Sequence, residues 1–141
     1  MLKNVLGVAV GLFIGLVMLG FIEFVGQLVF APKEGVDIND PVAMRELQAN
    51  QPIPKLVVLL AAWSIGALAG GWVCCELAGP QRIKAALVVG FLIQLVSIRV
   101  FMKVPHPVWL VIATQLIILP SAYAGTRITL FLENWHRGKR S

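Results

Sequence analysis

Residues 5–30 read VLGVAVGLFIGLVMLGFIEFVGQLVF, and this stretch decides the fold class. Glu23 is its single charged side chain. A helix needs about 20 consecutive apolar residues to cross the hydrocarbon core of a bilayer. The stretch exceeds that length, and it also exceeds the roughly 7–15 apolar residues of a cleavable signal peptide. We therefore predict a membrane-spanning helix that stays attached to the rest of the chain.

The composition of the whole chain is also typical of a membrane protein. Of its 141 residues, 58% are hydrophobic and 13% are charged, and the mean hydropathy is +0.84. Soluble domains have about 25% charged residues, so this chain lacks the polar surface that a soluble fold needs. The formal net charge is +5, but the basic residues form no aromatic-interleaved patch of the kind that binds nucleic acid. We expect a lipid bilayer around the protein and no nucleic-acid partner.

Three further segments are long and apolar enough to span a membrane, namely 55–78, 83–102 and 107–132. Short polar turns separate these three, which predicts antiparallel neighbours. The longer loop, 31–54, joins the first span to the second. Within it, Asp40 followed by Pro41 predicts the N-cap and first residue of a short helix over 41–50. The predicted fold is an all-α bundle of four transmembrane helices, with residues 1–141 forming one domain.

The distribution of Lys and Arg predicts the orientation of this bundle. One side, with both termini and the turn after the second span, carries Lys3, Arg82, Lys84, Arg137, Lys139 and Arg140. The opposite side carries fewer basic residues, Lys33, Arg45, Lys55 and Lys103. Because basic loops favour the cytoplasm, we predict that both termini are cytoplasmic and that the loop 31–54 is extracytoplasmic.

Small residues are expected at the contacts between the helices, because lipid is as apolar as leucine and close van der Waals contact must hold the bundle together. Glycines that are expected to pack occur on three of the spans: Gly7, Gly11, Gly15, Gly66, Gly70 and Gly125. The four-residue spacing within a span places these residues on one helix face. Such a face is suited to packing within the bundle or, alternatively, against another copy or another subunit.

Four ionisable residues lie inside the apolar spans: Glu23, Glu76, Arg99 and Arg127. A charge at mid-bilayer costs about 3 kcal/mol or more, so it usually has a partner or a function. At a rise of 1.5 Å per residue, Glu23 and Arg99 share a depth of about 10 Å below one membrane face. Glu76 and Arg127 share a depth of about 6–10 Å near the other face. We predict the ion pairs Glu23–Arg99 and Glu76–Arg127, with snorkelling of the arginines to headgroups as the alternative.

The sequence indicates no catalytic, metal or cofactor site, because it has no phosphate-binding glycine loop and no nucleophile elbow. Cys74 and Cys75 are adjacent in an apolar span, which favours packing over a disulfide or a metal site. Pro105, His106 and Pro107 form a stiff turn, and Trp109 follows it at the expected depth of the outer interface. We interpret His106 as a surface imidazole in a rigid hairpin, with a contact to a headgroup or a partner as the alternative.

Three stretches are distinctive when they occur together. They are MLKNVLGVAVG (1–11), PKEGVDINDP (32–41) leading into AAWSIGALAGGWV (61–73), and VPHPVWLVIATQLIILPSAYAG (104–125). Together they resemble a widespread group of small four-helix bacterial inner-membrane proteins of unknown function, and the Pro-His-Pro-x-Trp turn is the most specific part. The resemblance implies a multi-pass protein of the bacterial inner membrane and implies no activity.

These observations favour a non-enzymatic membrane protein that serves as an accessory or scaffold subunit, packing against a larger membrane complex or against itself. A first alternative is a small oligomeric transporter coupled to protonation of Glu23. Small multidrug exporters similarly have four helices and an essential glutamate in the first, although this chain is longer and places its glutamate nearer the outer end. A second alternative is a lipid- or quinone-binding protein, since grooves between such helices can hold acyl chains.

Overall fold

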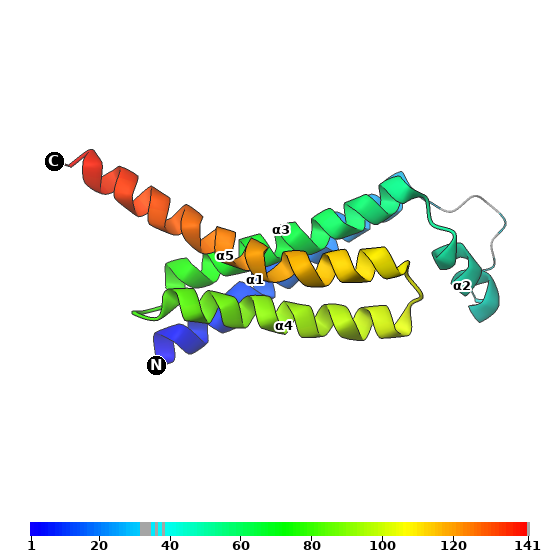
Figure 1. Ribbon diagram of the computed structural model, residues 1–141, viewed down its shortest axis with the longest axis horizontal. Coiled ribbons are helices and arrows are strands. Elements are labelled where there is room, and N and C mark those ends of the chain that lie inside the picture. The colour runs from blue at the N-terminus through cyan, green and yellow to red at the C-terminus, as the bar shows by residue number, and fades with distance from the viewer. Residues whose placement is uncertain (32–34, 36, 38, 141) are drawn as a thin grey trace.

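The computed structural model describes residues 1–31, 35, 37 and 39–140, and this described part is helical without any strand. Its helices are α1 (Leu2–Val29), α2 (Pro41–Ala49), α3 (Ile53–Leu77), α4 (Arg82–Lys103) and α5 (Val108–Gly138) (Figure 1). Four of them, α1, α3, α4 and α5, are long and apolar enough to cross a membrane. The four predicted spans are therefore confirmed as helices. Lys33 and Glu34 of the predicted loop lie outside the described residues.

Capping and proline chemistry set the helix boundaries. Asp40 accepts a hydrogen bond at its Oδ1 from the backbone N–H of Val42 at 2.9 Å, and Pro41 opens the first turn of α2. This confirms the predicted N-cap. Pro52 and Pro107 occupy the N-cap positions of α3 and α5. Both lack a backbone N–H, and so neither helix can extend backwards through them with a complete hydrogen-bond ladder.

Helix α5 continues well beyond its predicted end at Leu132. The reason is that the residues after the apolar segment, ENWHRG, can remain helical without needing lipid around them. His136 donates from Nδ1 to the carbonyl of Leu132 at 2.8 Å and so supports the last turns. In Figure 1 this last part of α5, coloured orange to red, diverges from the other helices.

Helix α3 is at the centre of the bundle. It packs against α1, α4 and α5, and in the described residues every helix-to-helix contact joins two of the four long helices. The buried core includes residues from all four: Leu19, Trp63, Ala67, Cys74, Ala85, Ala86, Val89, Ile93, Ile118 and Ala122. Two of the largest members, Trp63 and Ile93, lie on α3 and α4 and are almost fully buried.

The predicted glycine faces lie where the helices cross. A Cβ atom built on Gly11 of α1 would lie 2.6 Å from the carbonyl oxygen of Gly70 of α3. A Cβ on Gly125 of α5 would lie 2.6 Å from the backbone nitrogen of Trp72 of α3. Real Cβ atoms essentially never come closer than 3.0 Å to such atoms. These glycines therefore serve packing within the bundle, which is the first of the two alternatives considered from the sequence.

Different parts of the chain lie at the two ends of the bundle. Both chain termini and the α3–α4 turn lie at one end, which we call the terminal end (Figure 1). Helix α2 and the α4–α5 turn lie at the other, which we call the α2 end (Figure 1). Each end contains a cavity lined by charged side chains.

Candidate functional site

A cavity of about 340 Å³ at the α2 end collects polar side chains from four different segments. We call it the α2-end cavity. Its polar lining consists of Glu23, Gln27, Gln51, Lys55 and His106. Its apolar walls are Val58 and Leu59 of α3, Val100 of α4, and Val104 after α4. The cavity thus combines a carboxylate, an amine, an imidazole and two amides with an apolar wall.

The acid and the amine of this cavity do not neutralise each other. Glu23 projects from α1 one turn before Gln27, and Lys55 projects from the first turn of α3. Both side chains are half-buried. They form no ion pair, since the ion pair of the described residues joins Arg82 to Glu133 at the other end of the bundle. The cavity therefore presents two separated charges of opposite sign.

His106 is held in one orientation at the edge of the cavity. Its Nδ1 lies 2.9 Å from the carbonyl oxygen of Val104, and because a carbonyl can only accept, Nδ1 must carry the hydrogen. The His106 ring meets the Phe101 ring edge-on, with 5.0 Å between their centroids. The centroid of the Phe101 ring in turn lies 6.0 Å from that of the Trp63 ring. Nε2 is the nitrogen left for a ligand. The predicted surface imidazole is half-buried, with its ring against Phe101.

Helix α2 closes the cavity on the side away from the bundle. Met44 and Leu47 are three residues apart, which puts them on one face of this short helix, and both line the cavity. The helix-to-helix contacts of the described residues do not include α2. Its position therefore depends on its own cap at Asp40, on the flanking chain, and on these side chains.

The predicted pair of Glu23 with Arg99 is not formed. Arg99 is exposed and lines a separate hollow with Leu95 and Lys103. Glu23 and Arg99 have similar predicted depths in the membrane, which would allow a pair. Arg99, however, lies on a face of α4 that points away from Glu23. Ser97 of α4 points into the bundle, and two further residues turn the helix by about 200°, which directs Arg99 outwards. The cation that shares a cavity with Glu23 is Lys55, which the sequence places among the basic residues outside the spans.

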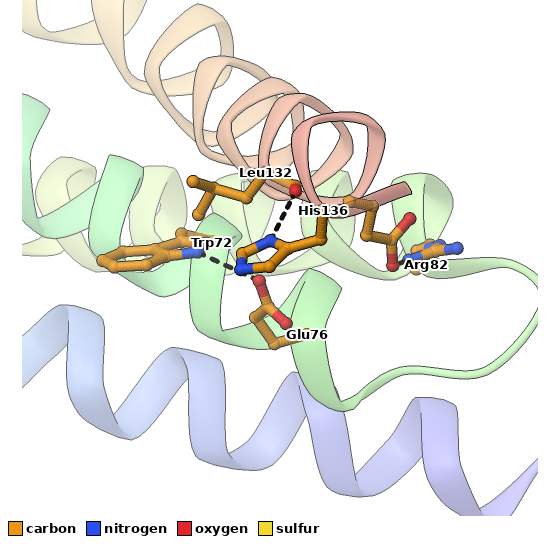
Figure 2. Close-up of polar contacts among 6 residues, drawn as sticks. Trp72, Glu76, Arg82, Leu132 and His136 are labelled. Atoms are coloured by element: carbon orange, nitrogen blue, oxygen red, sulfur yellow. Dashed lines mark hydrogen bonds and ion pairs between the residues drawn. The ribbon is translucent and has the colours of Figure 1, made fainter. Parts of the chain in front are cut away.

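The predicted pair of Glu76 with Arg127 is not formed either. Glu76 instead accepts a hydrogen bond at Oε1 from the indole Nε1 of Trp72, one turn earlier on α3, at 3.3 Å (Figure 2). Arg127 is exposed on α5. Its neighbours Gly125 and Thr126 are the residues that face the bundle, so the arginine points to the surroundings.

The ion pair that does form at the terminal end was missed from the sequence. Arg82 Nη1 lies 2.6 Å from Glu133 Oε1 and joins the start of α4 to the extended part of α5 (Figure 2). Glu133 lies just beyond the predicted end of the fourth span, at Leu132, and is therefore not among the charges predicted to lie inside the membrane. A signal was available, because an acid directly after an apolar span is placed beside the basic turn at 82–84.

A second cavity, of about 430 Å³, lies beside this pair, between α3 and the extended part of α5. We call it the terminal-end cavity. Its lining residues are Glu76, Thr129, Leu132, Glu133, His136, Arg137 and Arg140. Of these, only Glu76 was singled out from the sequence as a site residue.

The interior between α4 and α5 contains a small hydrogen-bond network. Gln115 donates from Nε2 to Ser97 Oγ at 2.8 Å, and Ser97 donates from Oγ to the carbonyl of Gln94 at 2.7 Å. Gln94 donates from Nε2 to the carbonyl of Gln115 at 3.2 Å. Polar groups inside a membrane bundle usually bond across helices in this way, so the network joins α4 to α5.

Cys74 and Cys75 are free and buried in the bundle, in line with packing. In the described part of the chain, no group of three His, Cys, Asp or Glu side chains is placed to hold a metal ion. Comparisons of the chain with protein-family models, curated proteins and solved structures find no match.

Proposed function

We propose that the protein is a non-enzymatic multi-pass membrane protein that binds the polar head of a membrane amphiphile in the α2-end cavity. The observation that supports this most is that Glu23 and Lys55 line one cavity with apolar walls and form no ion pair with any residue the structure describes. This develops the lipid- or quinone-binding alternative considered from the sequence.

The charges of the cavity favour a zwitterionic head group. A half-buried charge without a partner is costly, because it has lost part of its water and gained no counter-charge. A phospholipid head with an ammonium and a phosphate offers a counter-charge to both Glu23 and Lys55. Gln27 and Gln51 supply further hydrogen-bonding groups, and Val58, Leu59 and Val100 offer contact to the apolar part.

A quinone head fits the same cavity less well. Its carbonyl oxygens accept hydrogen bonds and would meet Lys55, but they bring no positive charge to Glu23. The carboxylate would then remain without a counter-charge beside an apolar ring. The geometry therefore favours a zwitterionic phospholipid, such as a phosphatidylethanolamine, over a quinone.

The test is the change in thermal unfolding midpoint of the purified protein in detergent when phosphatidylethanolamine is added. A ligand that binds only the folded state raises this midpoint. We expect the rise for the wild type and for Arg99→Gln, a control that removes a charge outside the cavity. We expect little or no rise for Glu23→Gln and for Lys55→Gln. An equal rise in all four proteins would reject the α2-end cavity as the site, and a rise with a quinone alone would reject the zwitterionic head.

A transporter coupled to protonation of Glu23 is the second candidate function. It is favoured by a specific observation, namely that this carboxylate lines a cavity and is not engaged in an ion pair within the described residues. Proton movement in liposomes that contain the protein tests it. If candidate substrates drive proton flux in the wild type and not in Glu23→Gln, transport is supported. Flux that survives the substitution would reject the role of Glu23.

The accessory or scaffold role remains a prediction from the sequence. One of its supports is weaker now, because the glycine faces that could have met another subunit pack inside the bundle. Mild solubilisation from native membranes, followed by size measurement and identification of co-purifying proteins, tests it directly. A lone monomer under every mild condition would count against both a larger complex and a homo-oligomer.

We also propose that the protein lies in a bacterial inner membrane with both termini in the cytoplasm. The support is the excess of Lys and Arg at the terminal end. Single cysteines introduced by Asn39→Cys and Lys139→Cys, in a chain with Cys74→Ala and Cys75→Ala, report the two ends separately. A membrane-impermeant maleimide should label the first in intact spheroplasts and the second only after lysis. The reverse pattern would overturn this orientation.

A further inference from the structure

We propose that the terminal-end cavity binds the phosphate of an anionic phospholipid. This site lies at the opposite end of the bundle from the α2-end cavity and does not depend on the function proposed for that cavity. Its basic lining groups are His136 and Arg137, on the extended part of α5, and Arg140, in the turn just after this helix, and Leu132 adds an apolar wall. Basic pockets at the ends of membrane helices are suited to anionic lipid heads.

The two acids of the cavity are already engaged. Glu133 binds Arg82 at 2.6 Å, and this guanidinium lies outside the cavity lining. Glu76 accepts the hydrogen bond of the Trp72 indole at 3.3 Å. Figure 2 shows Glu76 close to the indole of Trp72. With one carboxylate neutralised by Arg82, the remaining charge of the lining is positive.

The two arginines of the lining are available for a phosphate. In the described part of the chain neither Arg137 nor Arg140 takes part in an ion pair. Arg140 lies in the turn that follows α5, and its backbone N–H donates to the carbonyl of Arg137 at 3.1 Å, so the two residues stay close together. A guanidinium offers parallel N–H donors that match two phosphate oxygens. His136 is fixed on the last turns of α5, beside Arg137, by its bond to the Leu132 carbonyl, so the basic groups lie together at the end of this helix.

Aromatic residues on the other side of α5 indicate a lipid rather than a free phosphate. Phe131 and Trp135 are exposed, and their ring centroids lie 6.4 Å apart. Lys139 Nζ lies 5.2 Å from the centre of the Trp135 ring. Such an aromatic and basic pair is typical of the depth at which headgroups meet acyl chains. These side chains place the end of α5, and the cavity with it, at the level of the lipid headgroups, where a phospholipid phosphate is within reach.

The experiment measures binding of a fluorescent phosphatidylglycerol to the full-length protein in neutral detergent micelles. We expect the double variant Arg137→Gln/Arg140→Gln to weaken this binding about 10-fold or more, because each basic residue contributes to the attraction of an anionic head. The matched control is Arg45→Gln/Lys103→Gln, which removes the same charge from exposed positions at the α2 end and should bind like the wild type. Unchanged binding in the first variant, or equal loss in both, would overturn the proposal.

A third variant should strengthen the binding of phosphatidylglycerol instead of weakening it. Glu133→Gln removes a negative charge from the lining and frees Arg82, so we expect phosphatidylglycerol to bind more tightly. A general loss of folding cannot produce tighter binding, and weaker binding by this variant would contradict the proposed site.

Two competitors identify the source of the phosphate. Inorganic phosphate at millimolar concentration and phosphatidylcholine should both compete poorly, and full competition by either would reject an anionic lipid as the ligand.

Discussion

Gly15 of α1 and Gly66 of α3 face each other where these two helices cross. A Cβ atom built on either glycine would lie 2.8 Å from the carbonyl oxygen of the other. Both carbonyls belong to helical backbone and cannot easily move away. The absence of a side chain on both helices therefore sets the distance between them, and close approach increases the van der Waals attraction that holds helices together in lipid.

Replacement of either glycine by alanine should destabilise the bundle. For Gly15→Ala and for Gly66→Ala we expect a loss of about 1–3 kcal/mol in the free energy of unfolding, the usual cost of overpacking. The measurement is the thermal unfolding midpoint in detergent. Gly20→Ala is the matched control on α1, since no atom lies within 4 Å of a Cβ built there. If Gly15→Ala and Gly20→Ala unfold at the same temperature, the crossing is not as tight as described.

The ion pair between Arg82 and Glu133 should stabilise the protein only modestly. The two side chains are 33% and 39% exposed, and pairs with such exposure contribute about 0.2–1 kcal/mol because water and salt screen them. A double-mutant cycle with Arg82→Gln and Glu133→Gln measures this coupling from unfolding midpoints. We expect the charge-swapped protein, Arg82→Glu with Glu133→Arg, to recover part of the stability that either single reversal loses. Coupling that is zero at low salt would show that the pair has no energetic role.

Hydrophobic length and glycine spacing were sufficient to predict most of the fold. Four apolar segments gave four helices, because a span is defined by length and composition. Gly11 and Gly15 gave the contact face of α1, because residues four apart must share a helix face whatever the helix packs against. The end of α5 was not predicted, since helical propensity and not hydrophobicity decides how far a helix continues outside lipid.

The candidate sites were predicted much less well, and the reason is geometric. Depth in the membrane follows from counting residues, and it gave Glu23 and Arg99 similar levels. Pairing also requires that both side chains point to the same space, which depends on how each helix is rotated about its axis. That rotation is set by packing of the whole bundle. It directs Arg99 outwards and brings Lys55, from another helix, into the cavity of Glu23.

Removal of two buried hydroxyl groups, those of Ser97 and Thr114, should change the stability of the bundle differently. Ser97 Oγ both donates to Gln94 and accepts from Gln115, so Ser97→Ala leaves the Gln115 amide without this partner. We expect a loss of about 1 kcal/mol. Thr114 is fully buried, and its Oγ1 has no hydrogen-bond partner in the described residues. Thr114→Val keeps the shape of the side chain and removes the unsatisfied hydroxyl, so the unfolding midpoint should equal or exceed that of the wild type. A larger loss for Thr114→Val than for Ser97→Ala would contradict this assignment.

The cap of α2 should control access to the α2-end cavity. A helix of nine residues is marginal by itself, and the Asp40 carboxylate satisfies one of its first backbone donors, that of Val42. Asp40→Ala should therefore cost about 1 kcal/mol of helix stability and speed hydrogen exchange of the α2 amides. Glu46→Gln, a change at an exposed position of the same helix, is the control and should leave exchange unchanged. Because Met44 and Leu47 close the cavity, fraying of α2 should also reduce the thermal stabilisation by phosphatidylethanolamine. Fast exchange without any change in that stabilisation would show that α2 does not contribute to binding there.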